Sequence, residues 1–220
     1  MGMVFGKVDV ECAAHDTLQL RGGTASAAAA GFAVRRYHPH VLARVRRGAT
    51  VKENQMFGIL ATYIGVYGTP KNTGAGAAPR QIAMTAPVIS SVPQQIAMTA
   101  PVVSERESDM AFVLPAKYTA GADAPQPTDS RVELVDIPSR LVAVKTFSGS
   151  YDYTSSQEIA AKFQAELEDF GLECKSSGAW QLARYNPPFT LWWLRTNEIW
   201  VDIKENSKLI GDNVETTVNL

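Results

Sequence analysis

The sequence has few of the features that mark several common protein classes. It contains two cysteines, Cys12 and Cys174, far apart and outside any CxxC or Cys/His spacing, so we expect neither a disulfide framework nor a zinc site. No apolar run approaches the roughly 18 residues that a membrane-spanning helix requires. The first residues, MGMVFGKVDVECAAHD, lack the composition of a signal or transit peptide. These absences predict a cytoplasmic protein without a membrane span.

Charge and catalytic motifs are equally sparse. The formal net charge is -1 and no run of Lys or Arg is present, so nucleic acid is not an expected partner. Neither GxSxG nor HExxH occurs, and GAGAAP at 74–79 lacks the Gly-Lys-Ser/Thr ending of a phosphate-binding loop. The sequence therefore predicts no catalytic residue and is more typical of a binding protein than of an enzyme.

Hydrophobic periodicity in the first half predicts two strands and a helix. In GFAVRRYHPHVLARVRRG (31–48), apolar and polar residues alternate on both sides of His38-Pro39, which indicates two half-buried strands around a turn. The following segment, 53–67, has apolar residues at helical spacing and glycines at 65 and 68 that can end a helix. We expect an amphipathic helix there.

The second half follows the same plan. Residues 131–150 predict two strands around Pro138, and Ser155 to Glu158 forms a capping-box pattern that opens a helix ending at Gly171. WQLARYNPP and NEIWVDI then read as strands. Apolar positions of the two halves match at an offset of 100, an alignment that also places Ile82 on Leu182 and so predicts an internal duplication.

These elements predict an α+β fold. Each half has the order β-β-α-β-β with one long helix, and two such sheets must cover each other and their helices. We expect a distorted antiparallel β-barrel made from two pseudo-repeated halves, 31–115 and 131–203, followed by a tail at 204–220. The chain 1–220 would form a single domain, with linkers at 68–80 and 116–130.

The string QIAMTAPV occurs twice, starting at Gln81 and at Gln95. Because its apolar residues alternate, we assign the first copy to a strand at 82–88 and predict that both copies extend one hairpin. Met84 and Met98 could line a pocket, although methionine on such a strand is usually core.

Other residues are suited to ligand binding. His38 and His40 could coordinate iron through a neutral nitrogen, or could lie at the surface of the turn. Trp192, Trp193 and Arg184 combine aromatic faces with a guanidinium group, which suits a flat apolar ligand that carries carboxylates. Structural packing would also explain the tryptophans.

Six motifs in order then point to one family. They are IAMTAPV, AFVLPAKY (111–118), PQPTDSRVEL (125–134), AVKTFSG (143–149), LARYNPPFT (182–190) and RTNEIWV (195–201). With this set the chain resembles the SOUL haem-binding protein family over nearly its whole length. MGMVFGK and YIGVYG (63–68) are similar to the cytosolic plant-type members in particular.

The resemblance implies a soluble protein that binds haem or a related tetrapyrrole reversibly, as a carrier or buffer. It also implies haem contacts on one face of the first helix, which would be Phe57, Leu60, Tyr63 and Ile64. The sequence departs from the family at helix positions that are basic in some relatives, here Asn54 and Thr62.

The axial ligand and the activity stay open at this point. The histidine proposed as axial ligand in one animal member falls on Arg36, so His38 or His40 would have to substitute, or the iron would have no protein nitrogen. Two other functions are compatible with the sequence. One is an enzyme that removes or exchanges the metal of a tetrapyrrole, and the other is an effector-binding or protein-interaction domain.

Overall fold

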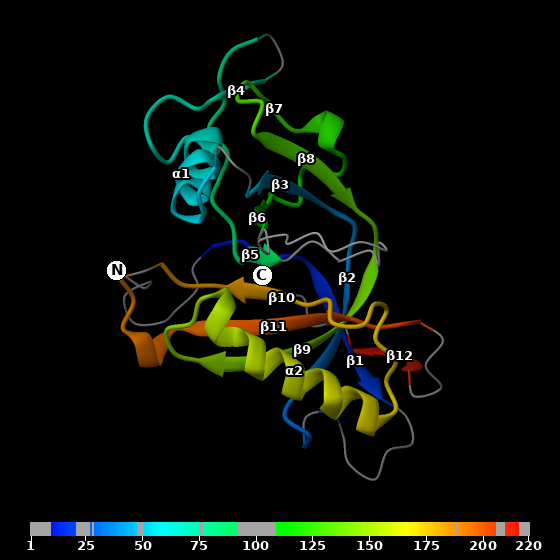
Figure 1. Ribbon diagram of the computed structural model, residues 1–220. Coiled ribbons are helices and arrows are strands. Elements are labelled where there is room, and N and C mark those ends of the chain that lie inside the picture. Colours follow the sequence, from blue (N-terminus) through cyan, green and yellow to red (C-terminus); the bar gives the residue numbers. More distant parts are fainter. Residues whose placement is uncertain are drawn as a thin grey trace, which may run out of the picture.

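The computed structural model describes residues 10–20, 27, 29–47, 51–74, 77–91, 109–187, 189–205 and 210–215. It has an α+β fold in which a strongly curled antiparallel sheet carries two helices (Figure 1). The strands of this sheet are β1 (His15–Leu20), β2 (Ala33–Tyr37), β3 (His40–Arg46), β5 (Val88–Ser91), β6 (Asp109–Val113), β8 (Val132–Ile137), β9 (Arg140–Ser148), β10 (Gln181–Arg184), β11 (Thr196–Asp202) and β12 (Ile210–Glu215). The helices are α1 (Glu53–Ile64) and α2 (Tyr153–Phe170), with 3-10 turns η2 (Gly121–Asp123) and η3 (Trp192–Leu194).

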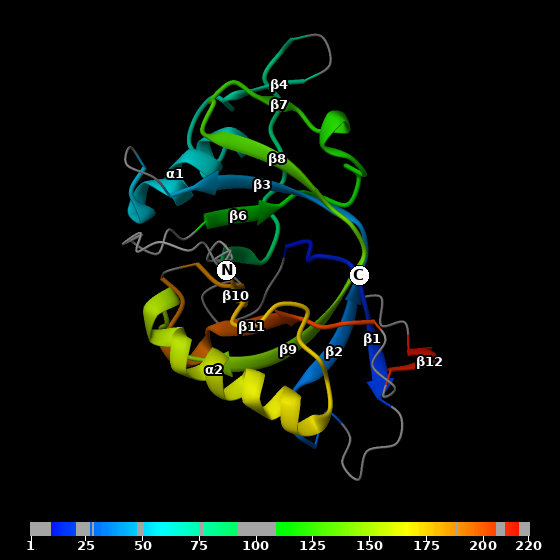
Figure 2. The same cartoon turned by 45° about the vertical axis from the view of Figure 1, so that its right-hand side comes forward.

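A bent two-stranded ribbon connects the two halves. β2 pairs with β9, where Arg36 lies opposite Leu141, and β3 pairs with β8 in the same register, where Val41 lies opposite Asp136. The predicted strands are confirmed, but His38-Pro39 bends one continuous ribbon instead of closing a hairpin. Each half therefore contributes one strand to the sheet of the other half, as the path of β2 and β3 in Figure 2 illustrates.

The sheet order is β12-β1-β2-β9-β11-β10-β5-β6-β3-β8. Among the described strands, the two end strands β12 and β8 do not pair with each other, so the sheet is a curled half-barrel and not a closed barrel. The halves meet again where β5 pairs with β10.

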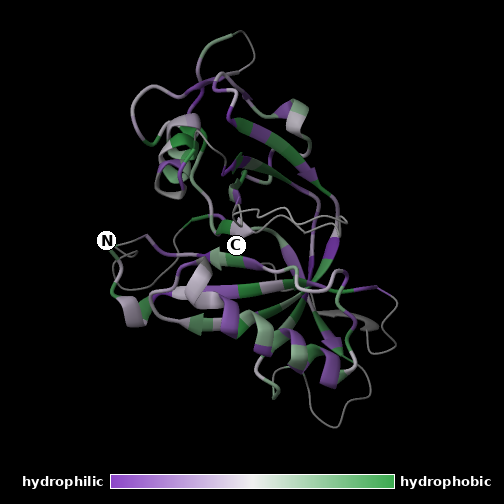
Figure 3. Cartoon of the chain, in the orientation of Figure 1, coloured by the Kyte–Doolittle hydropathy of each residue, from purple (hydrophilic) through white to green (hydrophobic). Residues whose placement is uncertain are grey.

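Three hydrophobic clusters fill the fold. One lies between α2 and strands that include β2, β9 and β11, and another lies between α1 and strands that include β3, β6 and β8. The third contains Tyr37, Leu42 and Trp200 and takes residues from strands under each helix, so it lies on the sheet face away from the helices, inside the curl. Along each strand the residues of this third cluster alternate with those of the helix-covered clusters, as two faces of a strand require. Figure 3 shows hydrophobic residues recurring along the strands that α2 covers.

The helix α1 ends three residues earlier than the sequence suggested. Gly65 adopts a left-handed conformation with φ 89, and its N–H reaches the carbonyl oxygens of Ala61 and Thr62. A Cβ at Gly65 would lie 2.5 Å from the ring of Pro70, so glycine is required both for the conformation and for the close approach.

The helix α2 starts earlier than predicted. Asp152 is its N-cap and accepts a hydrogen bond of 2.8 Å from the Ser155 N–H, while the Ser155 hydroxyl accepts one of 3.0 Å from the Asp152 N–H. The capping box is thus Asp152/Ser155 and not Ser155/Glu158. The predicted end at Gly171 is confirmed, because this glycine is left-handed with φ 86.

The first QIAMTAPV copy is mostly not a strand. Residues 81–85 have no strand assignment, Ala86 makes an isolated bridge to Cys12, and β5 begins only at Val88. The predicted strand at 82–88 is therefore wrong. The Ile82 N–H donates to the Ile64 carbonyl at the end of α1 and the Ala86 N–H to the Glu11 carbonyl, and Pro87 has no N–H to give to a ladder. The alignment of Ile82 with Leu182 also fails, since Leu182 lies within β10. The second copy falls outside the described residues.

The two predicted linkers contact each other. β4 (Asn72–Thr73), in the first linker, pairs with β7 (Gln126–Pro127), in the second, as Asn72 lies opposite Pro127. This short ladder closes over the end of α1, because the Tyr63 hydroxyl donates to the Pro125 carbonyl at 2.7 Å. None of the helices in the described ranges combines the length and apolar character that crossing a bilayer would need.

Candidate tetrapyrrole-binding surface

Three of the four helix residues predicted to contact a ligand are core residues in this structure. Leu60, Tyr63 and Ile64 are at most 1% exposed and pack against the sheet. Burial raises the pKa of Tyr63, so its hydroxyl stays protonated and donates to Pro125. Phe57 is half-buried and stacks edge-to-face on Phe112, with ring centroids 5.4 Å apart. Of the four, Phe57 therefore offers the ring surface that a ligand could reach.

A row of paired residues leads from Phe57 to a cationic side chain. Phe112 on β6 lies opposite Val88 on β5, and Val88 lies opposite Arg184 on β10. Phe57, Met84 and Val88 are half-buried and pack on the α1 cluster. We call Phe57, Met84, Val88 and Arg184 the α1–β10 surface. It combines half-buried apolar groups with a guanidinium group that donates to the Ser90 hydroxyl at 3.1 Å.

The chain after β10 carries exposed aromatic residues. Phe189 is 67% exposed, Trp192 59% and Trp193 53%, and Leu191 is also exposed. The two tryptophan rings meet edge-to-face with centroids 5.5 Å apart. We call residues 189–194 the aromatic loop. An exposed apolar group of this size on a single loop is typical of a ligand or partner surface.

Hydrogen bonds hold the aromatic loop in position. The Arg195 Nε donates to the Thr190 carbonyl at 2.8 Å, and the Thr190 N–H donates to the Pro187 carbonyl at 3.0 Å. Thr190 itself is buried, although its neighbours are exposed. The loop thus presents its aromatic rings from a defined backbone, which lowers the entropy lost on binding a ligand.

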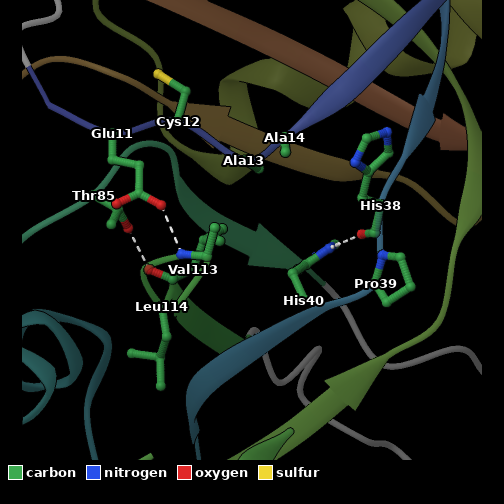
Figure 4. A pocket seen from close by; sticks show the side chains of 11 residues that line it. Glu11, Cys12, Ala13, Ala14, His38, Pro39, His40, Thr85, Val113 and Leu114 are labelled. Carbon is green, nitrogen blue, oxygen red and sulfur yellow. Dashed lines mark hydrogen bonds between the residues drawn. The ribbon is translucent and has the colours of Figure 1, made fainter. Parts of the chain in front are cut away.

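The two histidines of the bend lie in another region. His38 is half exposed and its Nε2 lies 3.0 Å from Asp16 Oδ2. His40 is 8% exposed, and its Nδ1 donates to the His38 carbonyl at 2.7 Å, as Figure 4 shows. Because Nδ1 carries the proton, Nε2 carries the lone pair. This nitrogen is buried and makes no hydrogen bond within the described residues.

His40 lines a small cavity beside the first described residues of the chain. The cavity measures about 20 Å³, room for a single water molecule, and is lined by both histidines of the bend, Cys12 and Thr85, among others, but not by Trp192 or Trp193. The structure therefore places His38 and His40 at this cavity, and the remaining accessible predicted residues on the α1–β10 surface or the aromatic loop. Leu60, Tyr63 and Ile64 lie in neither place, because they belong to the core. In the described part of the chain, no cluster of three or more His, Cys, Asp or Glu residues could hold a metal ion.

The burial of His40 predicts a dependence of stability on pH. Burial lowers the pKa of His40 below the ordinary 6.5, and the nearby Arg140 adds to this effect. Below about pH 6.5 the unfolded chain therefore binds a proton that the folded protein resists, so the free energy of unfolding falls on acidification. We expect His40→Asn, whose amide can donate to His38, to reduce the difference in stability between about pH 7.5 and about pH 5.5 in urea unfolding. An unchanged difference would contradict this assignment.

A buried charged cluster, which no sequence motif indicated, lies inside the curl of the sheet. Glu198 is 4% exposed and accepts hydrogen bonds from Arg35 at 3.0 Å, from the Tyr185 hydroxyl at 2.7 Å and from the Trp200 indole at 2.7 Å. Burial raises the pKa of both Tyr185 and Tyr37, so their hydroxyls remain protonated. Strand alternation in NEIWVDI places Glu198 on the same face as Trp200, and this pattern could have predicted a buried carboxylate.

Comparison with protein families decides the classification. The family model described as SOUL heme-binding protein matches residues 10–202. The chain belongs to the SOUL heme-binding protein family. This membership supports tetrapyrrole binding in general. No curated protein sequence matched the chain.

Solved structures resemble this SOUL protein in fold. The crystal structure of the EcmrR C-terminal domain aligns with a TM-score of 0.52 at 11% identity, over 79% of this chain and 96% of that one. A cryo-EM structure of an EcmrR–DNA complex aligns with a TM-score of 0.51 at 11% identity, over 79% of this chain and 57% of that one. At such low identity these likenesses show the curled antiparallel fold and nothing about function.

Proposed function

We propose that this SOUL protein binds haem or a related tetrapyrrole reversibly, as a carrier or buffer, on the α1–β10 surface and the aromatic loop. The observation that carries the proposal is the continuous row from Phe57 through Val88 to Arg184, followed along the chain by the exposed rings of the aromatic loop. Apolar and aromatic faces would cover the macrocycle, and Arg184 would pair with a carboxylate of its substituents.

In this proposal the iron does not require a protein nitrogen. The cavity beside His40 is too small for a porphyrin, and the Nε2 atom of His38 already lies next to Asp16. His38 and His40 therefore belong to the bend of the ribbon. The macrocycle is bound through stacking on its faces and through ion pairing of its carboxylates. A surface that binds through stacking and ion pairing accepts metal-free porphyrins as well as haem.

Titration of the protein with haemin, followed by the Soret band, tests the proposal. We expect saturable binding at micromolar haemin, and we expect Trp192→Ala/Trp193→Ala to weaken it about 10-fold or more, as hot-spot aromatics do. The matched variant Trp192→Phe/Trp193→Phe should keep most of the affinity, because it retains stacking faces. His40→Ala should leave the affinity unchanged.

Two outcomes would contradict the proposal. Absence of saturable binding would contradict tetrapyrrole binding by this chain. Binding that survives the double alanine variant but disappears in His40→Ala would show that the site lies at the ribbon bend. Recovery of the bound porphyrin chemically unchanged, with its metal, would support a carrier or buffer and not an enzyme. We also propose a cytoplasmic location, a single domain over residues 1–220 and a closer likeness to the plant-type members of the family.

A further inference from the structure

The first copy of the duplicated peptide QIAMTAPV occupies a defined place among the described residues. Residues 80–91 run from the end of α1 across the first described residues of the chain and into β5. We call the groups that contact residues 80–91 the repeat-binding site. We propose that residues 94–105, which contain the second copy, occupy this same site in a fraction of molecules, so that the chain has two registers. The inference does not rest on the proposed function.

Many contacts of the first copy are made by its backbone. The Asn72 side-chain oxygen accepts a hydrogen bond from the Arg80 N–H at 2.9 Å, and its amide group donates to the Arg80 carbonyl at 2.8 Å. The Ile82 N–H donates to the Ile64 carbonyl at 3.0 Å, and the Ala86 N–H donates to the Glu11 carbonyl at 2.9 Å. A segment with other side chains, including one with Gln94 in place of Arg80, could make all of these bonds.

The side chains that make specific contacts are present in both copies. Ile82 is 1% exposed within the α1 cluster, the Thr85 hydroxyl donates to the Val113 carbonyl, and the Ser90 hydroxyl accepts from Arg184. Their equivalents in the second segment are Ile96, Thr99 and Ser104. The two alanines and the proline of the first copy are also repeated.

Two further positions differ between the segments, and both changes are tolerable. Val103 replaces Ile89 and removes one methylene group from a buried position. Glu105 replaces Ser91, which is half-buried at the end of β5, so a longer side chain can reach solvent there. Ser91 lies opposite Asp109, however, and a glutamate in that place would face a like charge. This repulsion favours the first copy without excluding the second.

The connecting segments permit the exchange. With the first copy bound, the chain between β5 and β6 is 92–108, and the chain between β4 and the site is 74–79. With the second copy bound, these become 106–108 and 74–93. A connection of about three residues is common in antiparallel hairpins, and the entropy of loop closure changes slowly with length. One connection shortens while the other lengthens, so their effects on stability largely offset each other.

Charged substitutions test whether the copies substitute for each other. Ile82→Asp would lower the melting temperature by no more than about 4 °C, because the second copy takes over the site, and Ile96→Asp alone would have no effect. The double variant would lose about 10 °C or more, since either copy then buries an unpaired carboxylate. Ile64→Asp is the matched control: it lies in the same cluster, has no second copy, and should be additive with Ile96→Asp.

Hydrogen exchange and deletions give independent readouts. In Ile82→Asp, amide protection should move from peptides covering 82–91 to peptides covering 96–105. Deleting 81–94 or deleting 92–105 leaves one copy with the same connection lengths, so both variants should fold with similar melting temperatures. The proposal is overturned if Ile82→Asp alone destabilises as much as the double variant, or if the chain folds only when 81–94 is retained.

Discussion

Replacing Glu198 by alanine is expected to lower the free energy of unfolding by about 3–5 kcal/mol, the cost of removing one partner from a buried ion pair. Arg35 donates to both carboxylate oxygens at 3.0 Å, and its side chain is 17% exposed. Without Glu198, this guanidinium would stay inside the curl of the sheet with no carboxylate beside it. The Tyr185 hydroxyl and the Trp200 indole N–H would also lose their acceptor.

Urea unfolding at neutral pH measures this effect. Glu166→Ala is the matched control, because Glu166 also pairs with a cation, Lys145, but at the exposed side of α2. We expect a loss of no more than about 1 kcal/mol there. Equal losses of unfolding free energy for the two glutamate variants would show that the cluster inside the curl contributes no more to stability than a surface ion pair. Because Trp200 donates to Glu198 and stacks on Tyr37 with centroids 4.5 Å apart, its fluorescence should also change in Glu198→Ala.

Asn72→Ala is expected to destabilise the protein by roughly 3 kcal/mol, because three backbone groups, the Tyr63 carbonyl and the part-buried N–H and carbonyl of Arg80, would lose this partner. The Asn72 amide donates to the Tyr63 carbonyl at 2.7 Å and to the Arg80 carbonyl at 2.8 Å, and its oxygen accepts from the Arg80 N–H. The residue is 1% exposed, so water cannot easily replace these bonds. It joins the end of α1 to the start of the duplicated segment.

Thermal or urea unfolding of Asn72→Ala should be compared with Thr73→Ala. The Thr73 hydroxyl donates to the Gln126 carbonyl at 3.4 Å from an exposed position, so we expect a change of at most about 0.5 kcal/mol. Asn72→Asp keeps an acceptor for the Arg80 N–H but turns a negative charge toward two carbonyl oxygens. It should therefore be no more stable than the alanine variant. A loss for Asn72→Ala as small as that for Thr73→Ala would contradict the role assigned to Asn72.

Periodicity was sufficient to locate elements that pack on one face. The strands around His38 and Pro138 and both helices follow from local alternation or helical spacing, because each buries one face against the core. The start of α2 was misplaced because Asp152 and Ser155 form a box as good as the one expected from Ser155. The internal duplication stays a prediction. α1 and α2 begin at 53 and 153, but β5 and β10 begin at 88 and 181.

Strand partners and the binding surface could not be derived from the sequence. Alternation shows which face of a strand is buried but not which strand lies beside it. The α1–β10 surface depends on the registers that place Val88 between Phe112 and Arg184. The resemblance implied ligand contacts at Leu60, Tyr63 and Ile64, which are buried against the sheet in this structure. A pattern of apolar residues on a helix does not distinguish residues that contact a sheet from residues that contact a ligand.

The bent ribbon has a consequence for how the two halves depend on each other. β8 belongs to the second half by sequence but completes the sheet that α1 covers, and β2 belongs to the first half but lies between β1 and β9. The halves exchange strands in the way that the subunits of a domain-swapped dimer do. A fragment containing one half would expose an unpaired strand edge next to its own apolar cluster. The two halves are therefore obligate partners that happen to be covalently joined.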